Sequence, residues 1–177
     1  GISLSEYFMP GLGGVRWSRE HAKHTARTLN LINPDFIRLR TLHVKAGSDL
    51  DGMMQAGDFE PIGDEDILRE IRVFIEHLEG IASKIVSDHI LNLLEELEGR
   101  LPEDKPRLLE TIDGFFRLPE RDRLIFRVGR RSGNVRNLSD LSDRDLYLRI
   151  GAFVDGYAKK GQDCLERDLG RAMRRYI

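Results

Sequence analysis

The stretch YFMPGLGGVRWSREHAKHTARTLN, Tyr7–Asn30, decides how the sequence around it is interpreted. The short apolar segment Ile2–Met9 runs into it and is expected to form a β-strand. A glycine-rich turn follows, in which a Cβ atom would obstruct the chain. A helix comes next, and Ser18 fits its N-cap position. The glycines of the turn are Gly11, Gly13 and Gly14.

A second strand is predicted at Phe36–Val44, where strand-forming residues alternate with period two. Pro34 ends the preceding helix, because the residue before a proline avoids the helical conformation. Strand, turn, helix and strand are together typical of a βαβ unit with parallel strands and a right-handed crossover. Such a unit leaves strand edges and a sheet face open. We therefore expect pairing with further chain, or a homodimer or segment swap through these edges.

The rest of the sequence is predicted to be helical. A loop rich in Gly, Asp and Ser follows the second strand, and the composition changes near Glu60. We expect two domains, residues 1–60 with the βαβ unit and residues 61–177 with about six helices. The fold class is then mainly α with a small α/β part. The expected helices begin at Asp64, at Ser87 or Asp88, after Pro102, at Pro119, at Ser142 and after Gly161.

The composition excludes several classes of protein. Hydrophobic residues make up 40% and charged residues 33% of the chain, as in soluble globular proteins. The net charge of −2 gives no general attraction to nucleic acid or to anionic membranes. No apolar run approaches the roughly 20 residues of a membrane span, and no secretory leader is recognisable. The single cysteine, Cys164, excludes an internal disulfide, so we expect a cytoplasmic protein without a membrane partner.

Three motifs in the first sixty residues are similar to those of one family. GLGG, Gly11–Gly14, is similar to the GLPGQT of oxygen-independent coproporphyrinogen oxidases and to the GLGE of biotin synthase. NPDFIRLRTL, Asn33–Leu42, is similar to the L-x-P-D-x-I of those oxidases, and VKAGSDL, Val44–Leu50, to the VKGTPL of biotin synthase. Residues 1–60 therefore resemble the end of a radical S-adenosylmethionine (SAM) barrel. Ser87–Lys105 and Phe126–Gly133 resemble the helical tail of one radical SAM subgroup.

The resemblance implies a partial, TIM-like barrel and a binding surface for SAM. In the family, the fifth strand carries G-x-I-x-G-x-x-E, which contacts the SAM adenine. Gly11 corresponds to the second glycine and Met9 to the apolar position, whereas Tyr7 and Gly14 replace the first glycine and the glutamate. The residues implied on the adenine side are Met9, Gly11 and Gly13, with Thr41, Leu42 and His43 in the same pocket.

The family also uses a cofactor that this chain does not hold alone. C-x3-C-x2-C follows the family's first strand and binds three irons of a [4Fe–4S] cluster, and no such triplet occurs here. The resemblance thus implies the C-terminal portion of a radical SAM enzyme. Its full-length form would bind the cluster and SAM, cleave SAM reductively and abstract a hydrogen atom from a substrate. We expect the N-terminus to be a cut edge, the missing N-terminal half of the barrel to be the partner, and the fragment itself to hold no cofactor and to be inactive.

Several charged residues allow two interpretations each. Arg38 and Arg40 share one face of the second strand, where they could clamp a SAM carboxylate or an acidic substrate, or pair with Asp or Glu. His89 could be a substrate-facing acid or base, or a half-buried histidine in a capping turn. His21 and His24 lie three residues apart on a helix, but no third ligand accompanies them. We therefore expect solvated histidines and no metal site.

Seven arginines between residues 117 and 136 support a competing function. They could grip the phosphates of RNA or of a nucleotide, or form a solvated or internally paired surface, since acidic residues interrupt them. The competing function is a non-catalytic helical interaction module that binds a protein partner or RNA through this stretch. The glycine turn could likewise cradle a phosphate or be only a tight turn. The arginines are Arg117, Arg121, Arg123, Arg127, Arg130, Arg131 and Arg136.

Overall fold

The fold is mainly helical with a small mixed sheet, as the sequence predicts. The computed structural model describes residues 1–158 and Leu169. The chain divides into two compact units, Gly1–Asp113 and Gly114–Ile177. We expected a division near Glu60 instead, but two further strands after that residue join the sheet of the first unit.

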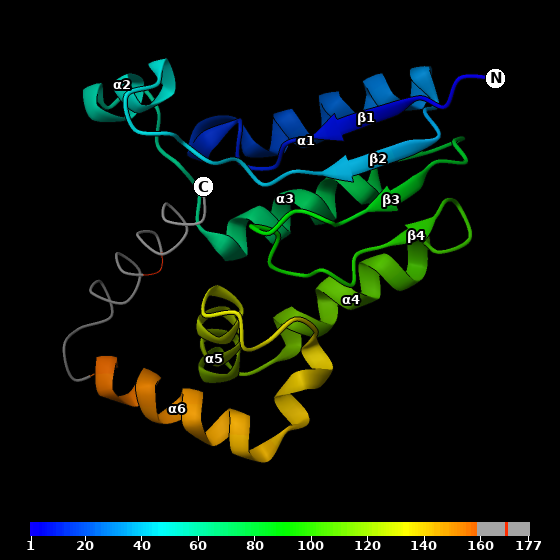
Figure 1. Ribbon diagram of the computed structural model, residues 1–177. Helices are drawn as coiled ribbons and strands as arrows, with labels where there is room; N and C mark the ends of the chain where they lie inside the picture. Colours follow the sequence, from blue (N-terminus) through cyan, green and yellow to red (C-terminus); the bar gives the residue numbers. More distant parts are fainter. Residues whose placement is uncertain (159–168, 170–177) are drawn as a thin grey trace. The chain divides into compact units, whose positions relative to one another are not determined.

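The sheet of the first unit has four strands in the order β1-β2-β3-β4 (Figure 1). The strands β1 (Ser5–Phe8) and β2 (Phe36–Leu39) are parallel, with Tyr7 opposite Arg38. β3 (Lys84–Val86) continues the parallel order, and β4 (Gly99–Arg100) runs antiparallel to β3. The predicted parallel strands on either side of a helix are therefore confirmed, and β1 forms an edge of the sheet.

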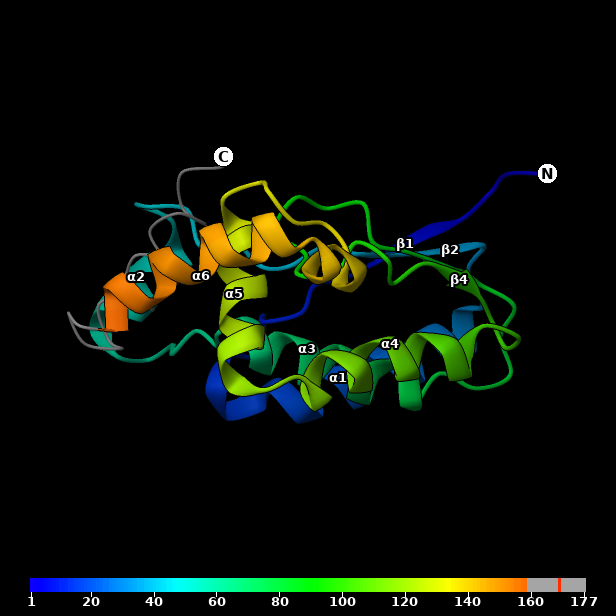
Figure 2. The same cartoon turned by 90° about the horizontal axis from the view of Figure 1, so that it is seen from below.

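Helices cover one face of this sheet. Figure 2 shows α1 (Gly14–Ile32), α3 (Asp64–Glu76) and α4 (Lys105–Arg117) on the same side of it. The core lies between these layers, where the ring of Phe8 stacks on that of Phe74 with centroids 3.8 Å apart. The strand residues that face the helices are fully buried, and burial of their apolar side chains is the main favourable term in folding. They are Phe8, Ile37, Leu39 and Ile85.

The boundaries of the first elements differ from the expectation for local reasons. α1 begins at Gly14 rather than after Ser18, because the Ser18 hydroxyl donates to a buried carboxylate on α3 and does not cap the helix. β2 is shorter than predicted, although the segment after it stays hydrogen-bonded to the chain around the end of β1 as far as Leu42. The expected loop contains a helix, α2 (Asp49–Ala56), which Ser48 caps by accepting a hydrogen bond from Asp51 N–H.

The predicted helix that starts at Ser87 or Asp88 is wrong. Residues 87–98 form turns and loops without a helix. The apolar side chains of this segment are not buried along one helical face. Ile90 is 50% exposed, whereas the leucines are all buried: Leu91, Leu93, Leu94 and Leu97. The Asn92 side chain donates a hydrogen bond to the carbonyl of Leu39, the last residue of β2, and this long-range bond holds the segment in its turns.

The second unit contains α5 (Glu120–Arg131), a 3-10 helix η1 (Leu138–Ser142) and α6 (Arg144–Ala158). α5 begins after Pro119 as predicted. The expected capping box at Ser142 lies instead at Asn137 and Asp140, where it opens η1. Tyr147 OH donates to Asp122 at 2.6 Å, and this bond raises the pKa of the Tyr147 phenol. The last expected helix, after Gly161, and Cys164 lie outside the described residues.

Candidate functional site

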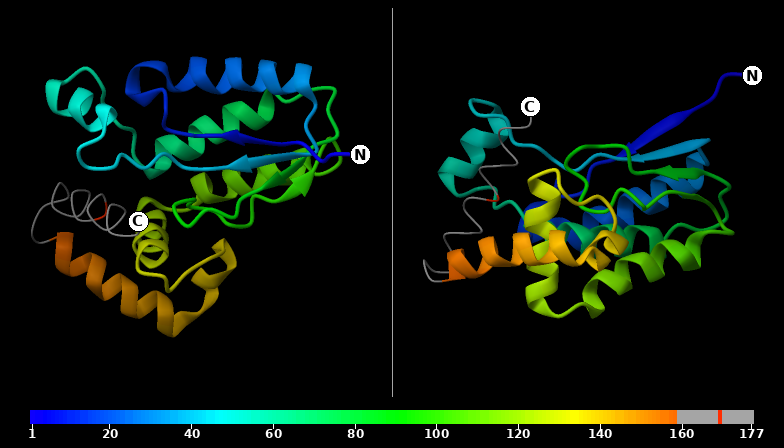
Figure 3. Two further views of the ribbon diagram at one scale, coloured as in Figure 1. Left: turned by 45° about the horizontal axis from the view of Figure 1, so that its top comes forward. Right: turned by 60° about the horizontal axis from the view of Figure 1, so that its bottom comes forward.

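The candidate site lies where the three parallel strands end, and we call this side of the sheet its carboxyl edge. The segments that follow β1, β2 and β3 leave the sheet at this edge, away from the N-terminus (Figure 1). The helix α2 lies beyond it in both views of Figure 3. In folds built from parallel strands and helices, ligands bind at the carboxyl ends of the strands. The segments concerned are 9–13, 40–44 and 87–92.

A buried carboxylate holds the glycine turn in place. Glu70 on α3 has a fully buried side chain. Its Oε2 accepts hydrogen bonds from the backbone N–H of Gly11 at 3.0 Å and from the hydroxyl of Ser18 at 2.9 Å. Its Oε1 lies 2.6 Å from Nδ1 of His21. Both carboxylate oxygens therefore have partners, as a buried charge requires, and one side chain ties the turn and α1 to α3.

The start of α1 is occupied by the protein's own backbone. Val15 N–H donates to the carbonyl of Glu60 at 2.8 Å, and Gly14 N–H donates to the carbonyl of Gly11 at 3.0 Å. A Cβ atom on Gly14 would lie 2.7 Å from the Glu60 oxygen, and Gly14 has a φ of +55°. These two N–H groups are already bonded within the protein, so they are not available to a phosphate.

A second buried network fixes the ends of β2 and β3. Asn92 Oδ1 accepts from the hydroxyl of Thr41 at 2.8 Å and from its N–H at 3.2 Å. Its Nδ2 donates to the carbonyl of Leu39 and to the hydroxyl of Ser87, both at 3.0 Å. Ser87 in turn donates to the carbonyl of Leu94 at 2.8 Å. Satisfied networks of this kind hold the surrounding backbone rigidly.

Most of the residues implied on the SAM side lie close together. Leu42 N–H donates to the carbonyl of Pro10 at 2.9 Å, so the segments after β1 and β2 lie side by side. A Cβ atom on Gly11 would come within 3.4 Å of the Leu42 side chain. Met9 is 38% exposed at this edge, and His43 is half-buried two residues after Thr41. The Thr41 hydroxyl is buried against Asn92, so it positions the segment.

Gly13 lies apart from this group. It borders a cavity of about 540 Å³ between the start of α1 and α2. The cavity is lined mainly by apolar side chains, among them Trp17, Met53 and Phe59. Only Gly13 of the implied set therefore faces α2.

The charged candidates occupy different environments. Arg38 and Arg40 both lie beside Asp88, at 2.5 Å and 3.5 Å. His89 is half-buried in a turn, not at a helix start. The expectation of a solvated side chain is wrong for His21, which contacts Glu70, whereas His24 is exposed.

The arginine stretch is partly internal. Three of its seven arginines have exposed fractions of 5–7%, which leaves these side chains little surface for contact with a phosphate chain. They lie on the last turns of α5, where cations also suit the negative end of the helix dipole. The buried arginines are Arg127, Arg130 and Arg131.

The sequence analysis did not identify Glu70 and Asn92, the two residues whose buried hydrogen bonds hold the carboxyl edge. Glu70 falls on the apolar stripe of α3, three residues after Ile67 and four before Phe74. A lone acidic residue on such a stripe signals a buried, bonded carboxylate. Asn92 stands among leucines that are all buried, and the same signal was present there.

Comparisons with models of protein families, with curated proteins and with solved structures gave no match. Within residues 1–158 and 169, no group of three or more His, Cys, Asp or Glu side chains is arranged to hold a metal ion. None of the helices in that part of the chain combines the length and the apolar character that crossing a membrane requires. A function is therefore proposed from the geometry of the carboxyl edge of the sheet.

Replacing Glu70 by alanine should destabilise the first unit by about 3 kcal/mol, because three donors lose a buried acceptor. Glu76→Ala on the same helix is the matched control. Glu76 is an exposed partner of Arg72, and its loss should cost about 0.5 kcal/mol or less. Urea unfolding of both variants measures the difference. Equal free energies of unfolding would contradict the assigned role of Glu70.

Two glycine substitutions should have opposite effects. Gly14→Ala should cost about 2 kcal/mol, since alanine disfavours a positive φ and its Cβ would meet the Glu60 carbonyl. Gly52→Ala lies inside α2, with nothing within 4 Å of the added Cβ, and should gain about 0.5 kcal/mol. Thermal unfolding of the two variants gives the signs, and a neutral Gly14→Ala would refute the close approach.

Proposed function

We propose that this chain is the C-terminal portion of a radical SAM enzyme. The unit with β1, α1 and β2 is the end of a partial TIM-like barrel, and the helices that follow form its tail. In its full-length form the enzyme would hold a [4Fe–4S] cluster through cysteines outside this chain and SAM partly through Met9, Gly11 and Leu42. The cluster, reduced by an external electron donor, would supply the electron for the cleavage of SAM that precedes hydrogen-atom abstraction from the substrate.

One observation carries the proposal: the parallel pairing of β1 with β2 places the segment after each strand beside the other. The N–H of Leu42 and the carbonyl of Pro10 join them at 2.9 Å. Met9, Gly11 and Leu42, which the resemblance assigns to the adenine side, thereby meet at the carboxyl edge of the sheet. Glu70 holds the Gly11 backbone there, and a rigidly held backbone favours a preorganised binding site.

The open edge of the sheet supports a partner of the same barrel. β1 is an edge strand, and Leu4 and Tyr7 are 43% and 59% exposed. Unpaired edge strands with exposed apolar side chains favour pairing with another strand. We propose that the N-terminal half of the barrel pairs along β1. A homodimer or a segment swap through the same edge is the competing arrangement for this chain alone.

The residues of this chain do not fit a [4Fe–4S] cluster. Such a cluster is held by several cysteine thiolates, and the chain has one cysteine, Cys164. The chain therefore supplies the SAM side of the site and no part of the cluster. It is not expected to be active alone. A cytoplasmic location belongs to the same proposal, because a chain with one cysteine forms no internal disulfide.

The interaction module that binds RNA has less support. Burial of Arg127, Arg130 and Arg131 removes part of the basic surface that phosphate contacts need. No observation favours a particular protein partner for α5 or α6. The radical SAM proposal is therefore preferred.

The proposal is tested on the native gene product, purified without oxygen. We expect the reading frame to continue upstream of the Gly1 codon and to contain C-x3-C-x2-C. The product should carry roughly four iron and four sulfide per chain. Replacing the three upstream cysteines by alanine is the control, and it should remove the iron. A native product that begins near Gly1 and holds no iron would contradict the proposal.

A further inference from the structure

Two arginines share one carboxylate on the sheet face that α1 and α3 do not cover. Arg38 Nη1 donates to Oδ2 of Asp88 at 2.5 Å, and Arg38 Nε donates to the hydroxyl of Ser5 at 3.3 Å. Arg40 Nη2 lies 3.5 Å from Oδ1 of the same aspartate. Two positive charges thus face one negative charge. One positive charge remains uncompensated within this cluster, which we call the Arg38–Arg40–Asp88 cluster.

Arg40 keeps unused hydrogen-bond donors. Its guanidinium makes the ion pair with Asp88 but donates no hydrogen bond to any residue in the described part of the chain. Only 33% of its side chain is exposed, so solvent reaches it less than it reaches a typical surface arginine. A guanidinium carries five N–H donors in a planar fork. The Arg40 guanidinium is therefore partly buried and has N–H groups that can donate to the oxygens of a ligand.

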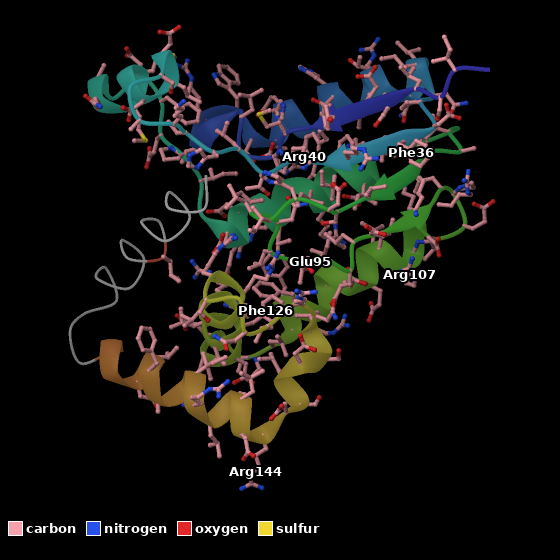
Figure 4. All side chains as sticks on the ribbon, in the orientation of Figure 1. Phe36, Arg40, Glu95, Arg107, Phe126 and Arg144 are labelled. Atoms are coloured by element: carbon pink, nitrogen blue, oxygen red, sulfur yellow. The ribbon has the colours of Figure 1, made fainter. Side chains whose placement is uncertain are left out.

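The backbone and an aromatic ring hold Arg40 in position. Its N–H donates to the carbonyl of Phe8 at 2.9 Å, and the next residue, Thr41, is bound by Asn92. The guanidinium carbon lies 5.5 Å from the centre of the Tyr7 ring, a cation–π contact. Figure 4 shows Arg40 just past the end of β2, at the opposite end from Phe36. The fork is thus presented beside the candidate SAM residues.

The acidic side chains nearby decide where an anion can bind. Asp88 also borders a cavity of about 360 Å³ together with Glu95 and Glu98. Three carboxylates repel an anion from that cavity. We therefore expect an anion to approach the cluster from the Arg40 side, next to Tyr7.

We propose that the Arg38–Arg40–Asp88 cluster binds an oxyanion, a carboxylate or phosphate group, of the ligand that this sheet face receives. Arg40 makes the direct contact, because its donors are unused. Asp88 is the internal counter-ion that holds both guanidinium groups while the ligand is absent. The planar fork of arginine matches carboxylate and phosphate oxygens in pairs. Naming this ligand as the enzyme's substrate rests on the proposed function, whereas the binding itself does not.

The test uses the purified chain and two probes, succinate for a carboxylate and inorganic pyrophosphate for a phosphate. Calorimetric titration at low ionic strength should show saturable binding of one probe, and the probe that binds more tightly identifies the oxyanion. Arg40→Gln should weaken that binding at least about tenfold, since a charge-assisted hydrogen bond is lost. Arg27→Gln, an exposed arginine on α1, is the matched control and should change nothing.

Two further variants separate binding from a structural role. Asp88→Asn keeps the shape but removes the competing charge, so it should tighten anion binding several-fold. Arg40→Lys keeps the charge and loses the fork, so it should bind between wild type and Arg40→Gln. Circular dichroism checks that each variant is folded. A structural role for Arg40 would instead make Asp88→Asn neutral or weaker in binding.

Three results would overturn the proposal: no saturable binding of either probe, equal binding by Arg40→Gln and Arg27→Gln, or unchanged or weaker binding by Asp88→Asn. The outcome is independent of the iron measurement. Iron in the native product without anion binding by the chain removes only this inference. Anion binding by the chain without iron in the native product keeps the site and removes the radical SAM assignment.

Discussion

The buried carboxylate of Glu70 is the constraint on which the rest of the first unit depends. A carboxylate in the interior is costly unless its oxygens are bonded, and here they bind the backbone of the glycine turn, a hydroxyl of α1 and the ring of His21. These partners come from two segments of the chain, whereas Glu70 belongs to a third. One side chain therefore ties both the glycine turn and α1 to α3. The stacking of Phe8 on Phe74 also packs β1 against α3.

The second network, around Asn92, does for β2 and β3 what Glu70 does for β1. Its amide joins the backbone of Leu39 and Thr41 to the Ser87 hydroxyl. The carboxyl edge of the sheet is thus held by polar groups that are almost wholly buried, with Met9 and Tyr7 exposed and Arg38 and Arg40 half-buried beside them. Side chains held on rigid elements keep the geometry that ligand binding requires. It is also the part of the molecule on which both proposals rest.

The sequence predicted the elements that local rules decide. Alternation in Phe36–Val44 and the proline after Asn33 gave the second strand and the end of α1, and the βαβ order gave parallel pairing. The helix at Asp64 followed from its apolar stripe. Open edges were expected on both strands of the unit, and the edge of β1 is open, but β3 pairs with β2 and covers its edge.

Long-range bonds decided what the sequence did not predict. Residues 87–98 have a leucine pattern that favours a helix, but the Asn92 side chain bonds to a strand about fifty positions earlier and holds this segment in turns. Ser18 left the cap position for Glu70, which lies 52 residues away. α2 formed inside a predicted loop because Ser48 caps it, although its glycine and aspartates favour a turn. Gly14 was predicted in the turn but is the first residue of α1, and the close approach of the Glu60 carbonyl to it could be found only from the fold.

The most direct measurement is hydrogen exchange at the Gly11 amide, resolved residue by residue in the purified chain. The account predicts strong protection of this amide, comparable to that of Leu42, and its loss when Glu70 is replaced while Leu42 stays protected. If the Gly11 amide exchanges in the wild-type chain as fast as in a free peptide, no buried carboxylate holds the turn. The organisation of the sheet edge described here would then be incorrect.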